Sequence, residues 1–525
     1  MRVLVADPIA AEGVALLRAS GIEVDIKTGL PPKELEAIIG GYDGLIVRSE
    51  TQVTEAVLTA GKALQVVGRA GVGVDNINVD AATRGGVLVV NAPTANTVAA
   101  AEHTVALMLA LARHVAQANA SLKGGKWDRK SFMGTQLRGK TLGIIGLGKV
   151  GSEVARRARA FEMRLIGMDP FVSKEFAQSL GVEIADKDQI LRESDFLTLH
   201  VPMTSSTKAL LTADDLAKAK PGLRIINAAR GGLIDEQALY DAVQSGKIAG
   251  AAVDVFTVEP AKDSPLFKSD KIIVTPHLGA STSEAQTQVA IEVVEQVLDV
   301  LRGRPARYAV NAPMLLPEAL AVLAPFVDVG VFIGSIATQL THGQMQSIVI
   351  RYAGDIAQHD TAFLKAAVIR GLLGPVSDER VNVVNAGLVA EQRGLRITEV
   401  KEAASEMYRN LLSVELATGS GKTVIAGTHN LGSVHIVQVN DYRMDVTAGN
   451  GHMLFIENQD RPGMVGKVGT IAGESDVNIS FMEVGRLTRR GLAMMVLGID
   501  EAMPEAAVKR LLQIPGILSV HQAEV

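Results

Sequence analysis

The sequence has no cysteine and a single tryptophan, and aromatic residues make up only 4% of the chain. Without cysteine, disulfides, thiolate nucleophiles and cysteine-ligated metals are excluded, a composition that fits a reducing compartment. The formal charge is −5 and the basic residues are scattered, so we expect no nucleic-acid partner. No signal-peptide pattern opens MRVLVADP, and apolar runs such as TVAAAEHTVALMLALAR are broken by charged residues. The sequence therefore predicts a cytoplasmic protein without a membrane partner.

What the chain has in quantity is Ala, Val, Leu, Ile and Gly, the residues of buried parallel strands covered by helices. A length of 525 residues exceeds a single core, so we expect three or four domains. From residue 1, the apolar runs RVLVADP, IEVDIKT, DGLIVRS, LQVVGRAGVG and VLVVNAP alternate with helix-like stretches. This pattern predicts a parallel α/β sheet, and the sheet carries no phosphate-binding glycine loop.

A glycine loop appears only later, in TLGIIGLGKVGSEVARRARA, where it follows an apolar strand and opens a helix. Gly146 would allow the tight turn, Gly148 would let the backbone approach a pyrophosphate, and Gly151 would let the helix meet the strand. Asp169 follows eighteen residues after Gly151 at the end of the next strand. Its carboxylate can accept hydrogen bonds from ribose hydroxyls and would repel a 2′-phosphate. The loop therefore predicts an NAD site and favours NAD over NADP.

The glycine loop does not lie near the start of the chain. We explain this position by an insertion of the dinucleotide-binding domain into the first α/β domain. We expect an uninterrupted helix from Thr97 to Gly124–Gly125, buried or spanning two domains, and a second long helix in STSEAQTQVAIEVVEQVLDVLRG. RYAVNAP then returns to the first unit. These expectations give a first domain of residues 1–97 and 282–313, a nucleotide domain of residues 98–281, and a cleft between them.

Residues 314–450 form a third region with weaker patterns. Helical segments are expected at QSIVIRYAG and TAFLKAAVIRGLL, and strands at VNVVNAGL, LLSVELAT and TVIAGTHN. ATGSGKTV resembles a phosphate loop, but Leu416 stands where a Walker motif needs glycine, so a hairpin turn is predicted. After the Gly/Asn linker TAGNGH, residues 451–525 show the order β-α-β-β-α-β of a ferredoxin-like domain.

Three polar residues follow strands of the second series, at the sheet edge where such folds bind ligands: Arg230, Glu259 and His277. Singly, each is an ordinary loop residue. Together they suit hydride transfer, because a histidine can take the hydroxyl proton as hydride leaves the carbon. A carboxylate bonded to that ring would favour the imidazolium, and an arginine can grip a carboxylate with two hydrogen bonds. No metal is expected to take part.

The motifs GLGKVG, NAARGGLIDEQAL, VDVFTVEP and TPHLGAST resemble those of the D-2-hydroxyacid dehydrogenase family, in the order usual for that family. VRSETQVTEAVL and VGRAGVGVDNIN are similar to its substrate domain, and ENQDRPGMVGKVGTIAGESDVNIS resembles an ACT domain. The resemblance covers the whole chain. It implies an α/β fold: a flavodoxin-like substrate domain with an inserted Rossmann domain, an α+β intervening domain and a C-terminal ferredoxin-like ACT domain.

The resemblance also implies roles by position. His277 would be the acid/base, Glu259 its partner, and Arg230 the substrate carboxylate anchor. The residues facing the cofactor would be Gly146, Gly148, Lys149, Val150, Gly151, Asp169, Thr207, Ala228, Ala229, Arg230, Asp254, His277, Gly279 and Ala280. Those facing the substrate from the first domain would be Arg48, Ser49, Val72, Gly73 and Asn96. Two further histidines have other predicted roles: His103 would be a packed or interface residue, and His200 would line the adenine side.

The long-form branch of this family implies an activity, the NAD-dependent oxidation of 3-phosphoglycerate on the route to serine. A phosphate in a partly desolvated cleft needs fixed cations. Arg48 is one candidate, and Arg129 and Lys130 of KWDRKSF are others, either as a solvated charge run or as phosphate contacts across a subunit interface. L-serine would bind paired ACT domains through Asn458, Asp460 and Asn478. A homo-oligomer, dimer or tetramer, is therefore expected.

Two alternatives stay open at this point. The chain could act on an unphosphorylated D-2-hydroxy acid such as glycerate, or it could be a non-catalytic NAD sensor built on the same scaffold. Arg48, the KWDRK cluster and the ACT-like tail argue against the first alternative. The absence of a basic face argues against the second.

Overall fold

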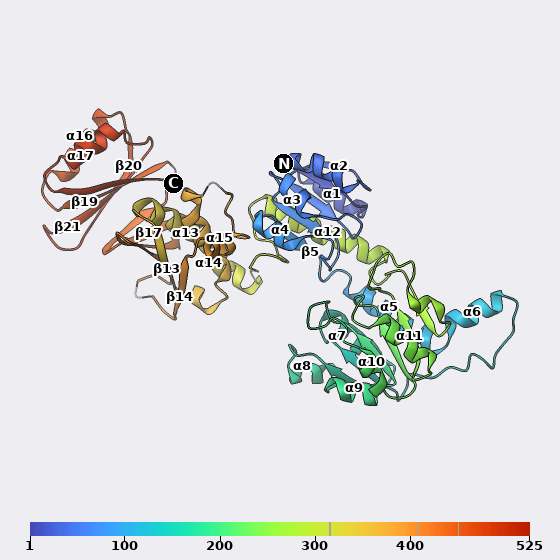
Figure 1. The fold of residues 1–525 in the computed structure, drawn as a ribbon. Helices are drawn as coiled ribbons and strands as arrows, with labels where there is room; N and C mark the ends of the chain where they lie inside the picture. Colours follow the sequence, from blue (N-terminus) through green and yellow to red (C-terminus); the bar gives the residue numbers. More distant parts are fainter. Residues whose placement is uncertain (314–316, 378, 406, 450) are drawn as a thin grey trace.

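The computed structural model describes residues 1–313, 317–377, 379–405, 407–449 and 451–525, with no side-chain description for residues 317 and 318. The chain forms four sheets, one in each segment that the sequence divides off (Figure 1). The predicted domain limits at residues 314 and 450, and Asn450 of the predicted linker, lie outside the described residues. Short 3₁₀ helices occupy Ile39–Gly41, Pro265–Lys268, Asp355–Gln358 and Gly374–Val376.

The first sheet is parallel, with strand order β2-β1-β3-β4-β5, the flavodoxin-like order. The chain returns to this sheet after residue 282, where the amide of Val310 donates to Val89 O at 2.8 Å. Helix α12 packs against this sheet although the whole second domain separates it from β5 in sequence (Figure 1). The elements are β1 Arg2–Val5, α1 Ala11–Ala19, β2 Glu23–Ile26, α2 Pro32–Ile38, β3 Gly44–Val47, α3 Glu55–Ala60, β4 Val66–Arg69, α4 Val79–Arg84, β5 Leu88–Asn91 and α12 Ser283–Leu301.

The second sheet has seven parallel strands in the order β12-β11-β10-β9-β6-β7-β8, a Rossmann arrangement extended by one strand. Its third strand along the chain, β8, is not among the predicted strands. The elements are α5 Thr97–Ala112, α6 Val115–Lys123, β6 Thr141–Ile145, α7 Lys149–Ala160, β7 Arg164–Met168, α8 Lys174–Ser179, β8 Val182–Ile184, α9 Lys187–Glu193, β9 Phe196–Leu199, α10 Ala213–Lys218, β10 Leu223–Asn227, α11 Glu236–Gln244, β11 Ile248–Val253 and β12 Ile272–Val274.

The predicted uninterrupted helix from Thr97 is wrong, because the chain breaks between α5 and α6. His114 adopts a left-handed backbone with φ 55°, and the two helices meet at 62°. Helix α5 is buried, as expected, whereas α6 buries none of its residues and projects from the nucleotide domain (Figure 1). Arg113 and His114 interrupt the apolar sequence after Ala112, and Val115 and Leu122 of α6 remain exposed.

The third sheet has the order β14-β13-β15-β16-β17-β18, and only the β13–β14 pair is parallel. Two predictions here are wrong: QSIVIRYAG lies in strand β13, and VNVVNAGL leads into helix α15. The hairpin predicted at ATGSGKTV is confirmed by the antiparallel β15–β16 pair. The elements are α13 Pro317–Leu340, β13 Met345–Gly354, α14 Ala362–Leu373, α15 Ala386–Gln392, β14 Arg396–Glu402, β15 Asn410–Thr418, β16 Gly421–Asn430, β17 Ser433–Val439 and β18 Tyr442–Thr447.

Within the described residues, one helix is apolar enough over its length to cross a membrane, namely the segment Ala319–Leu340 of α13. This segment is not among the predicted elements. Leu323, Val329, Ile333 and Ile336 pack it into the core of the third sheet, which accounts for its apolar sequence.

The fourth sheet has the order β20-β21-β19-β22, which confirms the predicted ferredoxin-like topology. Strand β19 alternates between two cores: Met453 and Phe455 join the core around α13, while Leu454 and Ile456 join the core around α16 and α17. The C-terminal sheet is thus covered on both faces. The elements are β19 His452–Gln459, α16 Met464–Glu474, β20 Ile479–Arg486, β21 Leu492–Ile499, α17 Glu505–Leu512 and β22 Ile517–Glu524.

Candidate active site

A cavity of about 620 Å³ lies between the first and second α/β domains, where the sequence predicts a cleft. Its walls are the carboxyl ends of β3 and β4, the start of α12, and the loops that follow β10, β11 and β12. The predicted residues that line it are Arg48, Ser49, Val72, Gly73, Asn96, Arg230, Glu259, His277 and Ala280. The structure therefore brings together the whole predicted catalytic set and the predicted substrate residues of the first domain.

The histidine and the glutamate form a direct pair. His277 Nδ1 lies 2.7 Å from Glu259 Oε2, and Glu259 Oε1 accepts the amide of Phe256 at 2.9 Å. Burial alone would raise the pKa of Glu259, but the bonds from His277 and Phe256 outweigh it, and the pKa is lowered. Glu259 is thus an ionised acceptor at neutral pH. The pairing favours a proton on Nδ1, which leaves the lone pair of Nε2 for a substrate proton.

The loop that carries His277 is held from below by Asp254, at the end of β11. Asp254 is fully buried and accepts the amides of Leu278 at 2.8 Å and Gly279 at 2.9 Å, which follow a left-handed His277 (φ 54°). Burial acts to raise the pKa of Asp254, but the hydrogen bonds from His103 and Thr275 and from the Leu278 amide lower it overall. The buried carboxylate is thus kept ionised and fixes the backbone that aims His277.

His103 reaches this carboxylate from helix α5. Its Nε2 lies 3.2 Å from Asp254 Oδ1 and 3.3 Å from Thr275 Oγ1. The sequence predicts His103 as a packed or interface residue, and the structure gives it an internal packed position. What the sequence does not show is its partner, because Asp254 lies 151 positions further along the chain.

Arg230 lies in the loop after strand β10, three residues beyond Asn227, and its side chain reaches toward the first domain. Its Nη1 donates to Ala229 O at 2.7 Å, and its Nε lies 3.9 Å from Asp75 Oδ2. A Cβ at Gly231 would lie 1.8 Å from Phe256 O, so only glycine lets this loop press against the loop that bears Glu259. The guanidinium therefore faces the cavity together with the acid/base pair.

A third arginine, Arg69 at the end of β4, is not among the predicted site residues. Its Nε is buried and has no hydrogen-bond partner among the described residues, while Nη1 donates to Ala70 O at 3.2 Å. Burial lowers the pKa of Arg69 to about 10, and the charges of Arg230 and Arg48 act in the same direction. A buried cation with two other cations nearby favours the approach of an anion. The signal was present in the sequence, since Arg69 ends a strand as Arg48 does.

The glycine loop has the geometry that the three predicted roles require. Gly146 has φ 96°, and a Cβ there would lie 2.4 Å from His200 O. A Cβ at Gly151 would lie 2.0 Å from Gly146 O, so the helix could not meet the strand with any larger residue. A Cβ at Gly148 would meet nothing within 4 Å. The open space at Gly148, at the N-terminus of α7, fits a pyrophosphate.

The other predicted cofactor residues surround this loop. Asp169 accepts the amides of Leu147 at 2.8 Å and Phe171 at 2.9 Å, one on each oxygen, which leaves further lone pairs for ribose hydroxyls. Helix α7 begins with Lys149 and Val150, and strand β10 is followed by Ala228 and Ala229. Gly279 lies two residues after His277. Thr207 closes the turn after β9, because its side chain donates to Pro202 O at 2.6 Å. These positions are compatible with NAD along the carboxyl edge of the sheet.

Three further predicted positions do not line the cavity between the domains. Arg129 and Lys130 lie on an exposed segment after α6 and do not line the cavity of their own chain. His200 is half-buried directly after β9, where burial lowers its pKa to about 4 and Nε2 lies 3.0 Å from Thr198 Oγ1. It is therefore a neutral, packed ring beneath the glycine loop, and no contact in the described residues bears on a place near adenine.

The predicted effector residues do not meet within one chain. Asn458 is buried near the end of β19, and Asp460 follows in the loop before α16. Asn478 precedes β20 and donates to Asp500 Oδ2 at 2.6 Å. Asn458 pairs with Ala493, whereas Ile479 pairs with Ile499, so the two groups are separated by about 20 Å along β21. One ACT-like domain therefore holds the two halves at opposite ends.

Comparisons with known proteins agree with this architecture. Family models match residues 105–279 (D-isomer specific 2-hydroxyacid dehydrogenase, NAD binding domain), 322–440 (D-3-phosphoglycerate dehydrogenase intervening domain) and 452–516 (ACT domain). The chain is 44% identical to a D-3-phosphoglycerate dehydrogenase of a Synechocystis species, over 100% of this chain and 95% of that one. This chain belongs to the D-3-phosphoglycerate dehydrogenase family. The resemblance inferred from the motifs is confirmed.

Two further relatives support the assignment of this chain to the family. A D-3-phosphoglycerate dehydrogenase of Archaeoglobus fulgidus is 41% identical over 100% of both chains. The crystal structure of the TT0316 protein from Thermus thermophilus covers 59% of this chain and 100% of its own, with a TM-score of 0.56 and 34% identity. The intervening and ACT segments extend the family scaffold beyond that shorter relative. The NAD-dependent oxidoreductase class and the NAD cofactor follow from the family models.

Proposed function

We propose that the chain oxidises 3-phospho-D-glycerate at its C2 hydroxyl with NAD, giving 3-phosphohydroxypyruvate and feeding the phosphorylated route to L-serine. The observation that carries this proposal is the placement of the His277–Glu259 pair opposite Arg230, Arg69 and Arg48 in one cavity. The acid/base pair supplies the proton chemistry. The arginines supply more positive charge than one carboxylate needs, which fits a substrate with a second anionic group.

Each side chain of the proposed site has a separate role in binding or proton transfer. Arg230 grips the substrate carboxylate, and Arg69 with Arg48 holds the phosphate, so C2 faces the imidazole. NAD held at the glycine loop would supply the acceptor for the hydride that leaves C2. His277 Nε2 takes the hydroxyl proton at the same time, and the ionised Glu259 stabilises the imidazolium that results. Asp254 holds the loop in place throughout.

Two connections join the domains that form the cavity, one that leads from β5 into α5 and one that leads from β12 into α12. We infer that the domains close about these connections, which excludes water before hydride moves. Arg129 and Lys130 do not line the cavity of their own chain, so their proposed contact with phosphate comes from a second copy. A homo-oligomer in the cytoplasm, with L-serine as feedback effector at paired ACT domains, completes the proposal.

The test is NADH absorbance with 3-phosphohydroxypyruvate as substrate. The wild-type chain should oxidise NADH, and His277→Asn should lose at least about 100-fold in kcat while still binding NADH. Absence of turnover in the wild type would favour the non-catalytic sensor instead.

The phosphate contact needs a separate comparison. Arg69→Gln and Arg48→Ala should each raise KM for 3-phosphoglycerate about tenfold or more and change KM for glycerate little, because glycerate has no phosphate to lose. Equal losses with both substrates would overturn the phosphate assignment and favour an unphosphorylated hydroxy acid.

A further inference from the structure

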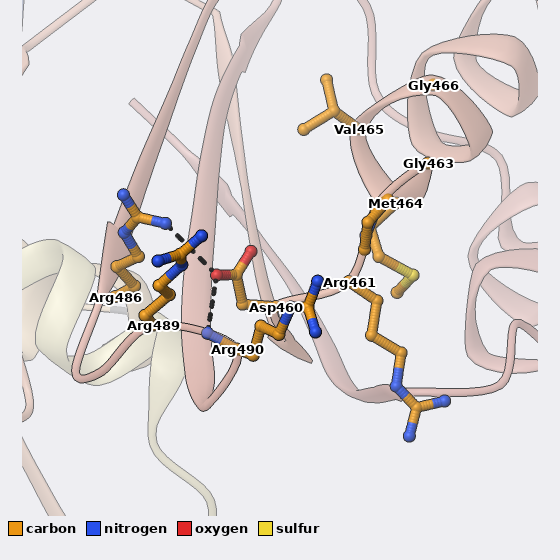
Figure 2. A pocket seen from close by; sticks show the side chains of 10 residues that line it. Asp460, Arg461, Gly463, Met464, Val465, Gly466, Arg486, Arg489 and Arg490 are labelled. Atoms are coloured by element: carbon orange, nitrogen blue, oxygen red, sulfur yellow. Dashed lines mark hydrogen bonds and ion pairs between the residues drawn. The ribbon is translucent and has the colours of Figure 1, made fainter.

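A second pocket, of about 350 Å³, lies on the C-terminal domain at the start of helix α16 (Figure 2). Residues 460–466 form one wall, and Arg486, Arg489 and Arg490 of the β20–β21 hairpin form the other. We call these three residues the hairpin arginines. Nothing in the proposed catalytic function uses them, since the cavity between the first two domains is lined by other elements.

The pocket carries a strong excess of positive charge. Its lining includes four arginines and a single carboxylate, Asp460. Asp460 Oδ2 lies 3.4 Å from Arg486 Nη1 and accepts the backbone amide of Arg490 at 3.1 Å. Figure 2 shows Arg486 and Arg489 on one side of this carboxylate and Arg490 on the other. One acid thus stands against three neighbouring cations, whose mutual repulsion favours a further anion.

Two of the hairpin arginines have guanidinium groups free to bind. Within the described part of the chain, no hydrogen bond or ion pair occupies the guanidinium of Arg489 or Arg490. The fourth arginine, Arg461, bonds Gln459 Oε1 and extends in another direction (Figure 2). The unoccupied forks of Arg489 and Arg490 match the planar donor geometry that phosphate oxygens accept in pairs.

The opposite wall adds backbone donors. Helix α16 starts at Met464 after a left-handed Gly463 (φ 87°) that provides no side-chain cap, and no acidic residue lies in its first turn. The amide of Met464 donates to Arg461 O at 3.3 Å, whereas Val465 and Gly466 of the first turn line the same pocket as the hairpin arginines, at the positive dipole end of this 11-residue helix. Side chains and helix together provide donors from two directions.

We propose that this pocket binds a small phosphate-bearing anion, such as a phosphate monoester. The charge excess distinguishes it from a site for serine, which is a zwitterion of zero net charge and would leave the hairpin arginines unneutralised. A volume of about 350 Å³ suits a metabolite of a few carbon atoms rather than a nucleic acid chain.

The pocket shares Asp460 with the proposed serine site, and this consequence rests on that proposed function. A bound phosphate would compete with Asp460 for Arg486, which frees the carboxylate for the ammonium group of an effector. Phosphate and serine should therefore alter each other's apparent affinity by the same factor.

The direct test counts inorganic phosphate bound to the full chain by equilibrium dialysis at fixed ionic strength. The wild type should bind two phosphates per chain, one in the cavity between the first domains and one here. The double variant Arg489→Gln/Arg490→Gln should retain one and lose at least tenfold in affinity at the other. The matched control Lys467→Gln/Lys509→Gln removes the same charge from exposed positions of the same domain and should bind two.

The outcomes separate this inference from the proposed function. Arg69→Gln should remove the cavity phosphate and keep the one at the hairpin. If that variant still binds two phosphates, the substrate assignment fails while the hairpin site stands. Equal binding by the hairpin variant and its control would overturn the hairpin site. The hairpin site would also be overturned if the hairpin variant bound an unchanged number of phosphates but showed a reduced molar mass in light scattering. The hairpin would then contact a second chain.

Discussion

At the scale of single residues, the proposed acid/base pair is supported by a second histidine–carboxylate pair. His277 and Glu259 face the cavity, while His103 and Asp254 lie behind them and hold the loop. The first pair follows from the sequence because both residues follow strands in a recognisable order. The second requires the fold, since only the packing of α5 on the sheet brings His103 to Asp254.

We predict that His103→Leu lowers kcat about 10- to 100-fold, because a buried carboxylate loses a donor and the His277 loop loses its alignment. His103→Gln should stay within about threefold of the wild type, since its amide can donate where Nε2 does. The pKa of Asp254, now lowered partly by His103, should rise in the leucine variant. The proposed function needs an ionised Asp254. On acidification, the leucine variant should therefore lose its activity at a higher pH than the wild type.

Steady-state kinetics across the acid range check this prediction. Superimposable pH profiles for the leucine and glutamine variants would show that His103 acts through packing alone.

A second residue-scale prediction concerns His200, whose pKa burial lowers from 6.5 to about 4. The unfolded chain binds the additional proton between these values, so stability falls as the pH falls from about 6.5 to 4, by at most about 3 kcal/mol. His200→Gln cannot take up this proton. Its thermal midpoint should therefore decline less between pH 7 and pH 5 than that of the wild type. Parallel curves from scanning calorimetry would contradict the assignment.

At the scale of elements, the sequence predicts regular alternations of strands and helices. It does not predict elements whose structure depends on packing against neighbouring elements. The two parallel sheets and the C-terminal domain follow from alternating strands and helices with clear glycine turns. Strand β13 is wrongly predicted as a helix, although Ile348, Ile350 and Tyr352 show a period of two. Ser347 and Val349 on the opposite face are also partly buried, which blurs that alternation.

Helix α15 shows the opposite error. The short apolar run Val381–Val384 suggests a strand, but Ala386, Val389 and Ala390 lie at helical spacing and pack against α14. Runs of this length do not distinguish the two structures without their neighbours. Arg69 is a different case: its position at the end of a strand is visible in the sequence, but its burial beside Arg48 and Arg230 requires the fold.

The β6–α7 connection gives an element-scale prediction with a built-in control. Gly148→Ala should leave the fold intact, because a Cβ there meets nothing within 4 Å, yet weaken NAD binding about tenfold or more by filling the cradle. Gly151→Ala places a Cβ 2.0 Å from Gly146 O and should destabilise the domain by several kcal/mol. Fluorescence titration and thermal melting separate the two effects. A normal affinity for NAD in Gly148→Ala would mean that pyrophosphate binds elsewhere.

At the scale of the whole molecule, contacts lead from the C-terminal domain to the first domain. The face of the ACT sheet that carries Phe455 shares one core with α13. Beyond that core, Asn382 Nδ2 donates to Gly86 O at 2.6 Å, and Arg380 Nη1 lies 3.4 Å from Leu64 O. A change at the effector site therefore has a packed route to the domain that lines the cavity, which regulation requires in addition to two alternative states.

The separation of the effector residues within one chain gives the last prediction. If serine binds between two paired ACT domains, each site takes Asp460 from one chain and Asn478 from the other. Asp460→Ala and Asn478→Ala should then each abolish serine binding in pure form. A mixed pair restores one site, because the intact Asp460 of one chain meets the intact Asn478 of its partner, and leaves the other site doubly defective.

Random reassembly of equal amounts makes half of the pairs mixed, so about a quarter of the wild-type sites should reappear. Calorimetric titration of the reassembled mixture with serine measures this fraction directly, and a mixture of wild type with either variant gives the reference. No recovery would place both residues in the same chain's site, at odds with the separation of about 20 Å along β21. Recovery of half of the wild-type sites would show that one of the two residues is dispensable.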